Sequence, residues 1–343
     1  MKEEFEFMIS LQDRQHRRVK YLRVSVTDRC NLRCLYCMPE KMEFLPRSEL
    51  LNFEEIQQLV EIFVSMGISK VRITGGEPLA RRDIVRLVDM LAGIKGLEDL
   101  AMTTNGVLLA PLAKELKSAG LTRLNVSCDT FNPEAFAKVT RWGELAPVLA
   151  GLQAARDAGF DSIKINAVLL RGVNDLDAGN MIRYCGEQGY LLRFIEFMPI
   201  GIDEYWSPER FMKVDEMKLL VENQGFKIEP LANEIPVGGG PAQYCQMTLP
   251  EGGAPVVVGF IGALSHNFCR MCNRVRLTSD GRVRECLTAG GQLSLRDMLR
   301  SSASRTDIES AIHQALYGKI DGHGFDLADG GLKTRVSMSA LGG

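Results

Sequence analysis

The sequence predicts an α/β protein, built as a TIM-like partial barrel of six β/α units followed by a smaller α+β domain. Strand-like and helix-like segments alternate through the first two-thirds of the chain, at intervals of about thirty residues. Such alternation is typical of parallel strands joined by helical crossovers. No glycine-rich dinucleotide-binding signature is present, which favours a barrel over an open doubly wound sheet. We expect residues 1–230 to form the barrel and residues 231–343 the second domain.

The expected barrel strands are short and largely apolar, and they cover residues 21–26, 70–74, 99–103, 122–127, 162–169 and 191–197. The helices between them are expected at residues 54–66, 82–91, 112–119, 145–158 and 176–188. Asn52 suits the N-cap of the first helix. Glycines favour the left-handed conformation that ends many helices, and they stand at positions 67, 120, 159 and 189.

The alternating pattern changes after Met198. We expect helices at 215–223 and 307–316, and strands at 256–261, 275–278 and 282–286. The dipeptide Asp280-Gly281 between the last two strands predicts a hairpin. Residues 231–253 are rich in glycine and proline, so we expect a linker or an irregular crossover there.

Composition excludes several classes of function. The 343 residues carry a net charge of −2, so no strong field favours nucleic acid or a membrane surface. The longest apolar stretches have the length of strands, and residues 1–10 are acidic without an apolar signal core. We therefore expect a cytoplasmic protein with no nucleic-acid or membrane partner. In that compartment, nine cysteines indicate metal or redox chemistry more than disulfides.

Three cysteines, Cys30, Cys34 and Cys37, follow the first expected strand with the spacing C-x3-C-x2-C. Structural zinc takes four protein ligands, and iron–sulfur clusters commonly take four cysteines. A cluster held by three cysteines would leave one iron open to a further ligand. This first cysteine triad is therefore a candidate reactive metal centre.

A second cysteine triad, Cys269, Cys272 and Cys286, lies near the C-terminal hairpin and leaves two interpretations open. His266 could complete a zinc site with three cysteines and one histidine. Alternatively, the triad holds a second iron–sulfur cluster with an open iron. The cysteines at 128, 185 and 245 stand alone and are expected to be buried small apolar residues.

Short polar motifs follow several expected strands, at the end where active sites lie in barrels of parallel strands. They include Gly75-Gly76-Glu77-Pro78, Thr103–Gly106, Ser127 with Asp129, and Glu196–Pro199. Gly76 would let the backbone approach a ligand closely, because no Cβ is in the way. Together these motifs predict a pocket.

Basic residues interrupt four apolar strands, at Arg23, Arg72, Lys164 and Arg193. Unpaired buried cations are costly, so their repetition suggests that they face a shared polyanion such as a nucleoside triphosphate. Lys70 is a further candidate, and Arg274 and Arg276 would point to one face of the C-terminal hairpin. No P-loop is present, so ordinary nucleotide hydrolysis is not suggested.

The first cysteine triad, with Tyr36 before its third cysteine, resembles the radical S-adenosylmethionine (SAM) superfamily. More specific segments are similar to the GTP 3′,8-cyclase family, which performs the first step of molybdenum cofactor biosynthesis. These segments are residues 25–31, 72–79 and 193–198 and the second cysteine triad. The resemblance runs from about Leu22 to Gly343.

The resemblance implies SAM and two [4Fe–4S] clusters as cofactors, one cluster on each cysteine triad. It implies that SAM is contacted by Tyr36, Gly76, Ser127 and Met198. It implies that GTP is contacted by Arg23, Lys70, Arg72, Thr103, Lys164, Arg193, Arg274 and Arg276. It also implies that the C-terminal residues Gly342 and Gly343 reach into the site.

The implied reaction is that of a lyase, with GTP as substrate. A 5′-deoxyadenosyl radical takes the ribose 3′ hydrogen, and the ribose radical attacks C8 of guanine. The product is (8S)-3′,8-cyclo-7,8-dihydroguanosine 5′-triphosphate, and no side chain is assigned a catalytic role beyond the cofactors. The implied partners are a low-potential electron donor, the downstream cyclic pyranopterin monophosphate synthase and a second copy in a homodimer.

The sequence leaves two alternatives open. One is a radical SAM enzyme that modifies a peptide and uses the second cluster as an auxiliary centre. The other is a non-catalytic zinc or iron–sulfur module that binds a nucleotide. The cationic strands favour GTP over a peptide, because a peptide needs few phosphate ligands.

Overall fold

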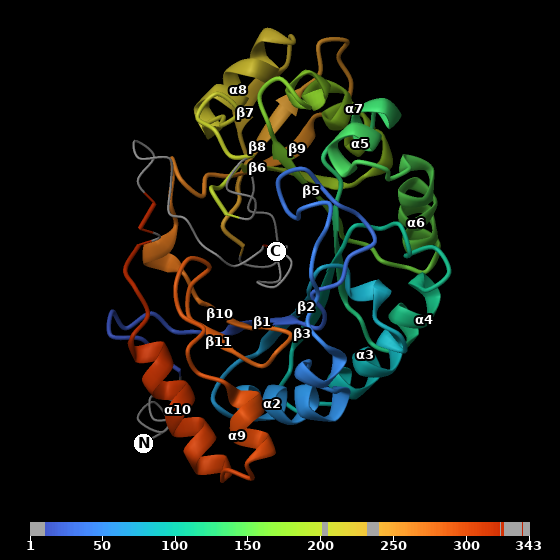
Figure 1. Cartoon of the computed structure of the whole chain (residues 1–343). Helices are drawn as coiled ribbons and strands as arrows, with labels where there is room; N and C mark the ends of the chain where they lie inside the picture. Colours follow the sequence, from blue (N-terminus) through green and yellow to red (C-terminus); the bar gives the residue numbers. More distant parts are fainter. Residues whose placement is uncertain (1–10, 201–204, 232–239, 323, 326–337, 339–343) are drawn as a thin grey trace.

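The computed structural model describes residues 11–200, 205–231, 240–322, 324, 325 and 338. Its centre is a row of six parallel strands with helices on the outside (Figure 1). In chain order these are β1 (Tyr21–Ser25), β2 (Lys70–Thr74), β3 (Asp99–Thr104), β4 (Arg123–Ser127), β5 (Ile163–Leu169) and β6 (Leu191–Glu196). Within the described sheet β1 and β6 do not pair with each other, so the barrel is partial, as predicted.

The crossover helices are α2 (Phe53–Ser65), α3 (Ile84–Ala92), α4 (Ala113–Ser118), α5 (Pro133–Thr140), α6 (Leu145–Asp157) and α7 (Ala178–Gln188). Figure 1 shows α3, α4 and α6 along one outer side of the sheet. Asn52 caps α2 as predicted: its side chain accepts the Glu55 N–H, and the Glu55 carboxylate accepts the Asn52 N–H. The four glycines expected at helix ends all have positive φ angles.

The part of the chain after β6 extends both edges of this row of strands. At one edge, β9 (Val256–Ile261) lies parallel to β6 and continues into antiparallel β8 (Gln243–Thr248) and β7 (Lys227–Pro230). At the other edge, β10 (Arg274–Leu277) lies parallel to β1 and forms a hairpin with β11 (Val283–Arg284). The C-terminal strands therefore pair with both edge strands of the open barrel, β1 and β6.

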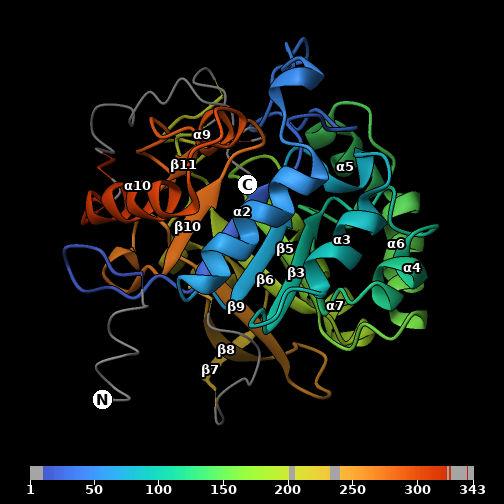
Figure 2. The same ribbon diagram turned by 90° about the horizontal axis from the view of Figure 1, so that it is seen from below.

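Among its described residues, this C-terminal part contains the helices α8 (Val214–Asn223), α9 (Leu295–Arg300) and α10 (Arg305–Tyr317). Figure 2 shows α9 and α10 beside β10 and β11. The boundary at residue 230 remains a prediction, but one continuous sheet crosses it.

The prediction of a linker over residues 231–253 was wrong for β8, which is a regular strand. Its sequence is half polar because its side chains alternate between buried and more exposed positions near the sheet edge. β7, α5 and α9 were also not expected. They have four, eight and six residues, which is too short for a clear periodic signal.

Among the residues that the structure describes, no helix combines the length and the apolar character needed to cross a membrane.

The pairing pattern predicts that residues 1–230 do not form a stable soluble protein alone. Deleting residues 231–343 removes β10 from β1 and β9 from β6. Both strands then become unpaired sheet edges, and such edges promote aggregation. We expect the truncated chain to elute as aggregates in size-exclusion chromatography and to lack a cooperative thermal transition by circular dichroism. A monodisperse, cooperatively melting fragment would contradict this expectation.

Candidate functional site

One cavity of about 380 Å³ collects every predicted site residue that the structure describes. The predicted SAM contacts in its lining are Tyr36, Gly76, Ser127 and Met198. The predicted GTP contacts there are Arg23, Lys70, Arg72, Thr103, Lys164, Arg193, Arg274 and Arg276. Both cysteine triads line the same cavity, whereas Gly342 and Gly343 lie outside the described residues.

The register of the strands places three of the cavity's cations in one row. Arg276, Arg23 and Arg72 are direct neighbours on β10, β1 and β2. Neighbouring side chains of a parallel sheet at the same register lie on the same face. Three guanidinium groups from segments far apart in the sequence therefore lie side by side.

The arginines of the cavity are buried and incompletely paired. Nε of Arg23, Arg72 and Arg193 and Nη1 of Arg276 have no hydrogen-bond partner among the described residues. Burial, together with neighbouring arginines, lowers the pKa of Arg276 and of Arg193 to about 10. Buried N–H groups of this kind are costly unless they bind an anion. Burial and the charges of Arg193, Arg123 and Arg72 also lower the pKa of Lys164 to about 7.

Asn125, which the sequence analysis missed, orders two of these arginines. With its amide oxygen turned towards them, it accepts from Arg193 Nη2 at 2.7 Å and from Arg72 Nη1. Arg123 and Asp99, also missed, form a bidentate pair in the same cavity. A polar residue between Leu124 and Val126 was the available signal for Asn125.

The first cysteine triad lies in the loop after β1 and is fixed by the Gly75-Gly76 turn. The Gly76 N–H donates to Thr27 O at 2.7 Å, and the Glu77 N–H donates to Arg29 O at 2.8 Å. A Cβ on Gly76 would lie 2.4 Å from Arg29 O, so only glycine fits beside the residue before Cys30.

Two buried carboxylic acids, Asp129 and Glu77, lie near this triad. Tyr36 Oη donates to Asp129 Oδ2 at 2.7 Å, and the Val168 N–H donates to Asp129 Oδ1 at 2.9 Å. Burial raises the pKa of Asp129 to about 6 and that of Glu77 to about 7. Burial, with the neighbouring Cys30 and Asp129, raises the pKa of Cys37 to about 12. Asp129 thereby orients Tyr36, a role that sequence reasoning did not find.

The second cysteine triad lies in a cationic environment instead. Cys269 begins a single helical turn before β10, Cys272 directly follows that turn, and Cys286 lies two residues after β11. Burial would raise the pKa of the Cys272 thiol, but the positive charges of Lys319 and Arg274 outweigh this effect and lower it. The three isolated cysteines expected to be buried are so: Cys128, Cys185 and Cys245 are at most 8% exposed.

The zinc interpretation of the second triad is not supported. The His266 ring lies 3.3 Å from the Asp215 carboxylate and does not line the cavity. Among the described residues, no three histidine, cysteine or acidic side chains are grouped as ligands of a single metal ion. Three cysteines that form no disulfide and line one cavity can serve as the ligands of a polynuclear cluster.

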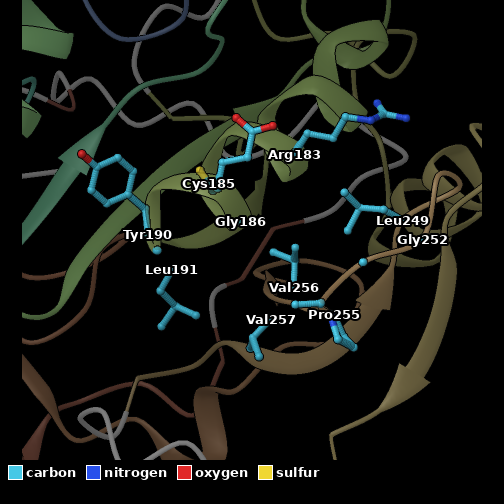
Figure 3. A pocket seen from close by; sticks show the side chains of 14 residues that line it. Arg183, Cys185, Gly186, Tyr190, Leu191, Leu249, Gly252, Pro255, Val256 and Val257 are labelled. Carbon is cyan, nitrogen blue, oxygen red and sulfur yellow. The ribbon is translucent and has the colours of Figure 1, made fainter.

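A second hollow, of about 460 Å³, lies between α7 and β9 and contains none of the predicted site residues. Figure 3 shows Leu191, Leu249, Val256 and Val257 around it. Arg183 at its rim pairs with Glu251 at 2.7 Å. Its described lining offers neither cysteine triads nor buried cations, so the chemistry is concentrated in the first cavity.

Comparisons with known proteins agree with this geometry. Residues 24–185 match the Radical SAM superfamily, and residues 190–325 match Molybdenum Cofactor Synthesis C. The GTP 3′,8-cyclase of Rhodopirellula baltica is 45% identical, over 98% of this chain and 92% of its own length. That of Thermodesulfovibrio yellowstonii is 42% identical, over 91% of this chain and 95% of its own length.

Among solved structures, Streptococcus suis SuiB bound to its precursor peptide SuiA superposes with a TM-score of 0.60 at 13% identity. The match covers 90% of this chain and 69% of SuiB, and it is a likeness of fold alone. SuiB bound to S-adenosylmethionine gives a TM-score of 0.57 over 85% of this chain and 68% of SuiB. Because the curated relatives match over nearly its full length, the chain belongs to the GTP 3′,8-cyclase family of the radical SAM superfamily.

Proposed function

We propose that this chain converts GTP to (8S)-3′,8-cyclo-7,8-dihydroguanosine 5′-triphosphate, the first step of molybdenum cofactor biosynthesis. The observation that carries the proposal is the single cavity that holds two cysteine triads together with buried, incompletely paired arginines. A nucleoside triphosphate supplies the negative charge that such cations lack. The family membership and the names of the curated relatives support the same substrate.

The residues present fit SAM and two [4Fe–4S] clusters, since each triad offers three thiol ligands and leaves room for a further one. When bound, SAM and the first cluster supply the radical that abstracts the ribose 3′ hydrogen of GTP. Cys30, Cys34 and Cys37 would hold the first cluster, and the second cysteine triad the other. The SAM contacts would be Tyr36, Gly76, Ser127 and Met198, with Tyr36 held in place by Asp129.

The protein's own task is to bind and orient GTP. Arg23, Arg72 and Arg276, in one row, would hold the triphosphate, and Asn125 keeps Arg72 in place beside Arg193. The other GTP contacts would be Lys70, Thr103, Lys164, Arg193 and Arg274. Burial of these groups keeps water away from a reactive radical. No acid–base side chain is required for the hydrogen abstraction.

The proposal extends to partners. A low-potential electron donor would deliver electrons, and cyclic pyranopterin monophosphate synthase would consume the product. We further propose a homodimer and a role for Gly342 and Gly343 inside the cavity. The buried cations argue against a peptide substrate, because a peptide backbone carries no negative charge to neutralise them.

The function is tested under anaerobic conditions. The chain is reconstituted with iron and sulfide and then given dithionite, SAM and GTP. We expect 5′-deoxyadenosine together with the 3′,8-cyclised nucleotide, both identified by mass spectrometry. Cleavage of SAM that is indifferent to GTP, with ATP and buffer as controls, would contradict the proposed substrate.

A second prediction concerns Gly76→Ala. The new Cβ would collide with the Arg29 carbonyl, and the displaced backbone carries Cys30. We expect iron to fall from about eight atoms per chain to about four, because only the second triad keeps its cluster. Gly93→Ala is the matched control, since a Cβ there meets only ordinary contacts at 3.7 Å and beyond. Equal iron content in the two variants would disprove this role of Gly76.

A third prediction concerns pH. The pKa of Lys164 is about 7, and a bound triphosphate stabilises its protonated form. GTP binding above this pH therefore takes up a proton, so affinity should fall as pH rises, by up to about tenfold per pH unit. In the Lys164→Arg variant the guanidinium at this position stays charged, so the slope should flatten.

The measurement is calorimetric titration of GTP between about pH 7 and about pH 9. The titration of GTP itself is common to both proteins and cancels when their slopes are compared. Parallel slopes for the wild type and Lys164→Arg would show that Lys164 does not carry the pH dependence.

A further inference from the structure

Lys319 is a buried lysine outside the predicted site residues. It follows α10 and is only 2% exposed. Its ammonium donates to the carbonyl oxygen of Arg274 and, at 2.6 Å, to that of Glu285. Arg274 stands two residues after Cys272, and Glu285 directly precedes Cys286. One ammonium group therefore bridges the two chain segments that carry two of the three cysteines.

Arg17 makes the corresponding contact to the third cysteine. Its Nη1 donates to Cys269 O at 2.7 Å, and its Nη2 donates to Ile320 O at 2.9 Å. Its Nε donates to Asp13 Oδ2 at 2.5 Å, and both side chains of this pair are at least nine-tenths buried. Arg17 thus links, through its hydrogen bonds, the backbone of Cys269 to that of Ile320, the residue after Lys319.

The two cations differ in how their charge is balanced. Asp13 forms a salt bridge with Arg17. Burial lowers the pKa of Lys319, and the groups that favour its charged form are Cys272 and Cys286, which are negative only as thiolates. Carbonyl oxygens accept its hydrogen bonds but carry no net charge. An uncompensated buried cation is costly, so its position beside these cysteines is best explained by their acting as thiolate ligands.

We propose that Lys319, held by Arg17, is a positioning residue for the second cluster: it fixes the spacing of the three cysteines, and its charge makes that cluster easier to reduce. Reduction adds one negative charge beside the ammonium, which the ammonium stabilises. This inference rests on the proposed function only in assigning a cluster to the second triad. Its test requires neither GTP nor SAM.

The experiment uses the full chain with Cys30, Cys34 and Cys37 all replaced by alanine, so that only the second cluster is observed. In this background we compare Lys319→Met, Lys319→Arg and the control Lys114→Met, which removes an exposed lysine on α4. Each protein is reconstituted anaerobically. Iron is counted, and the midpoint potential is measured by electron paramagnetic resonance during a dithionite titration.

We expect Lys319→Met to shift the midpoint potential to more negative values, or to lose the cluster while the circular dichroism spectrum stays native. Lys319→Arg should restore iron content and move the potential back towards that of the control. A potential and iron content equal to those of Lys114→Met would overturn the proposal. A purely structural role would not move the potential of a cluster that is retained.

If Lys319→Met does not fold, Arg17→Gln decides the question. It removes the donors to Cys269 O and Ile320 O but adds no bulk. We expect faster loss of iron from the second triad to the chelator bathophenanthroline than in Lys114→Met. Identical rates of iron loss would overturn the proposal as well.

Discussion

The strongest electrostatic constraint on this structure is that several cations are buried inside a parallel sheet. Arg276, Arg23 and Arg72 lie at the same register on three adjacent strands, where parallel sheets normally carry apolar side chains. The protein offsets part of the cost with neutral or paired groups. The Asn125 amide accepts from two arginines, and the ring of Tyr21 lies 5.6 Å from the Arg72 guanidinium. The cavity is thereby organised for an anion before one binds.

The two cysteine triads share a ligand type but not an electrostatic environment. The first triad lies near the buried carboxyl groups of Glu77 and Asp129, and burial raises the pKa values of its thiols. The second lies near Lys319 and Arg274, which lower the pKa of Cys272. Negative surroundings disfavour added electrons, and positive surroundings favour them. The difference would suit a first triad whose cluster donates an electron and a second triad whose cluster lies beside an anionic nucleotide.

Much of the fold was predictable, because the barrel strands and helices carry strong local signals. β2 was predicted to the residue, and the Asn52 cap and the glycine-ended helices follow from local interactions within a few residues. The errors have a common cause. β8 is stabilised by its pairing with β9, and α9 by packing of Leu295 into the core. These long-range contacts leave no pattern in the sequence of a short segment. Asn125 was missed as a site residue for the same reason, since the two arginines it contacts lie on other strands. Asp129 was expected to line the pocket, but its hydrogen bond to Tyr36 could be seen only in the tertiary structure.

The sequence by itself determined the two cysteine triads, the Gly75-Gly76 turn and the presence of basic residues in strands. These features depend on spacing along the chain, which sets local geometry directly. Only the tertiary structure decided that the triads share one cavity, that three arginines form a row, and that Lys319 and Arg17 reach the second triad. Arg17 and Cys269 are 252 positions apart in the sequence. Their contact exists because β10 pairs with β1, so strand pairing, rather than local spacing, assembles the site.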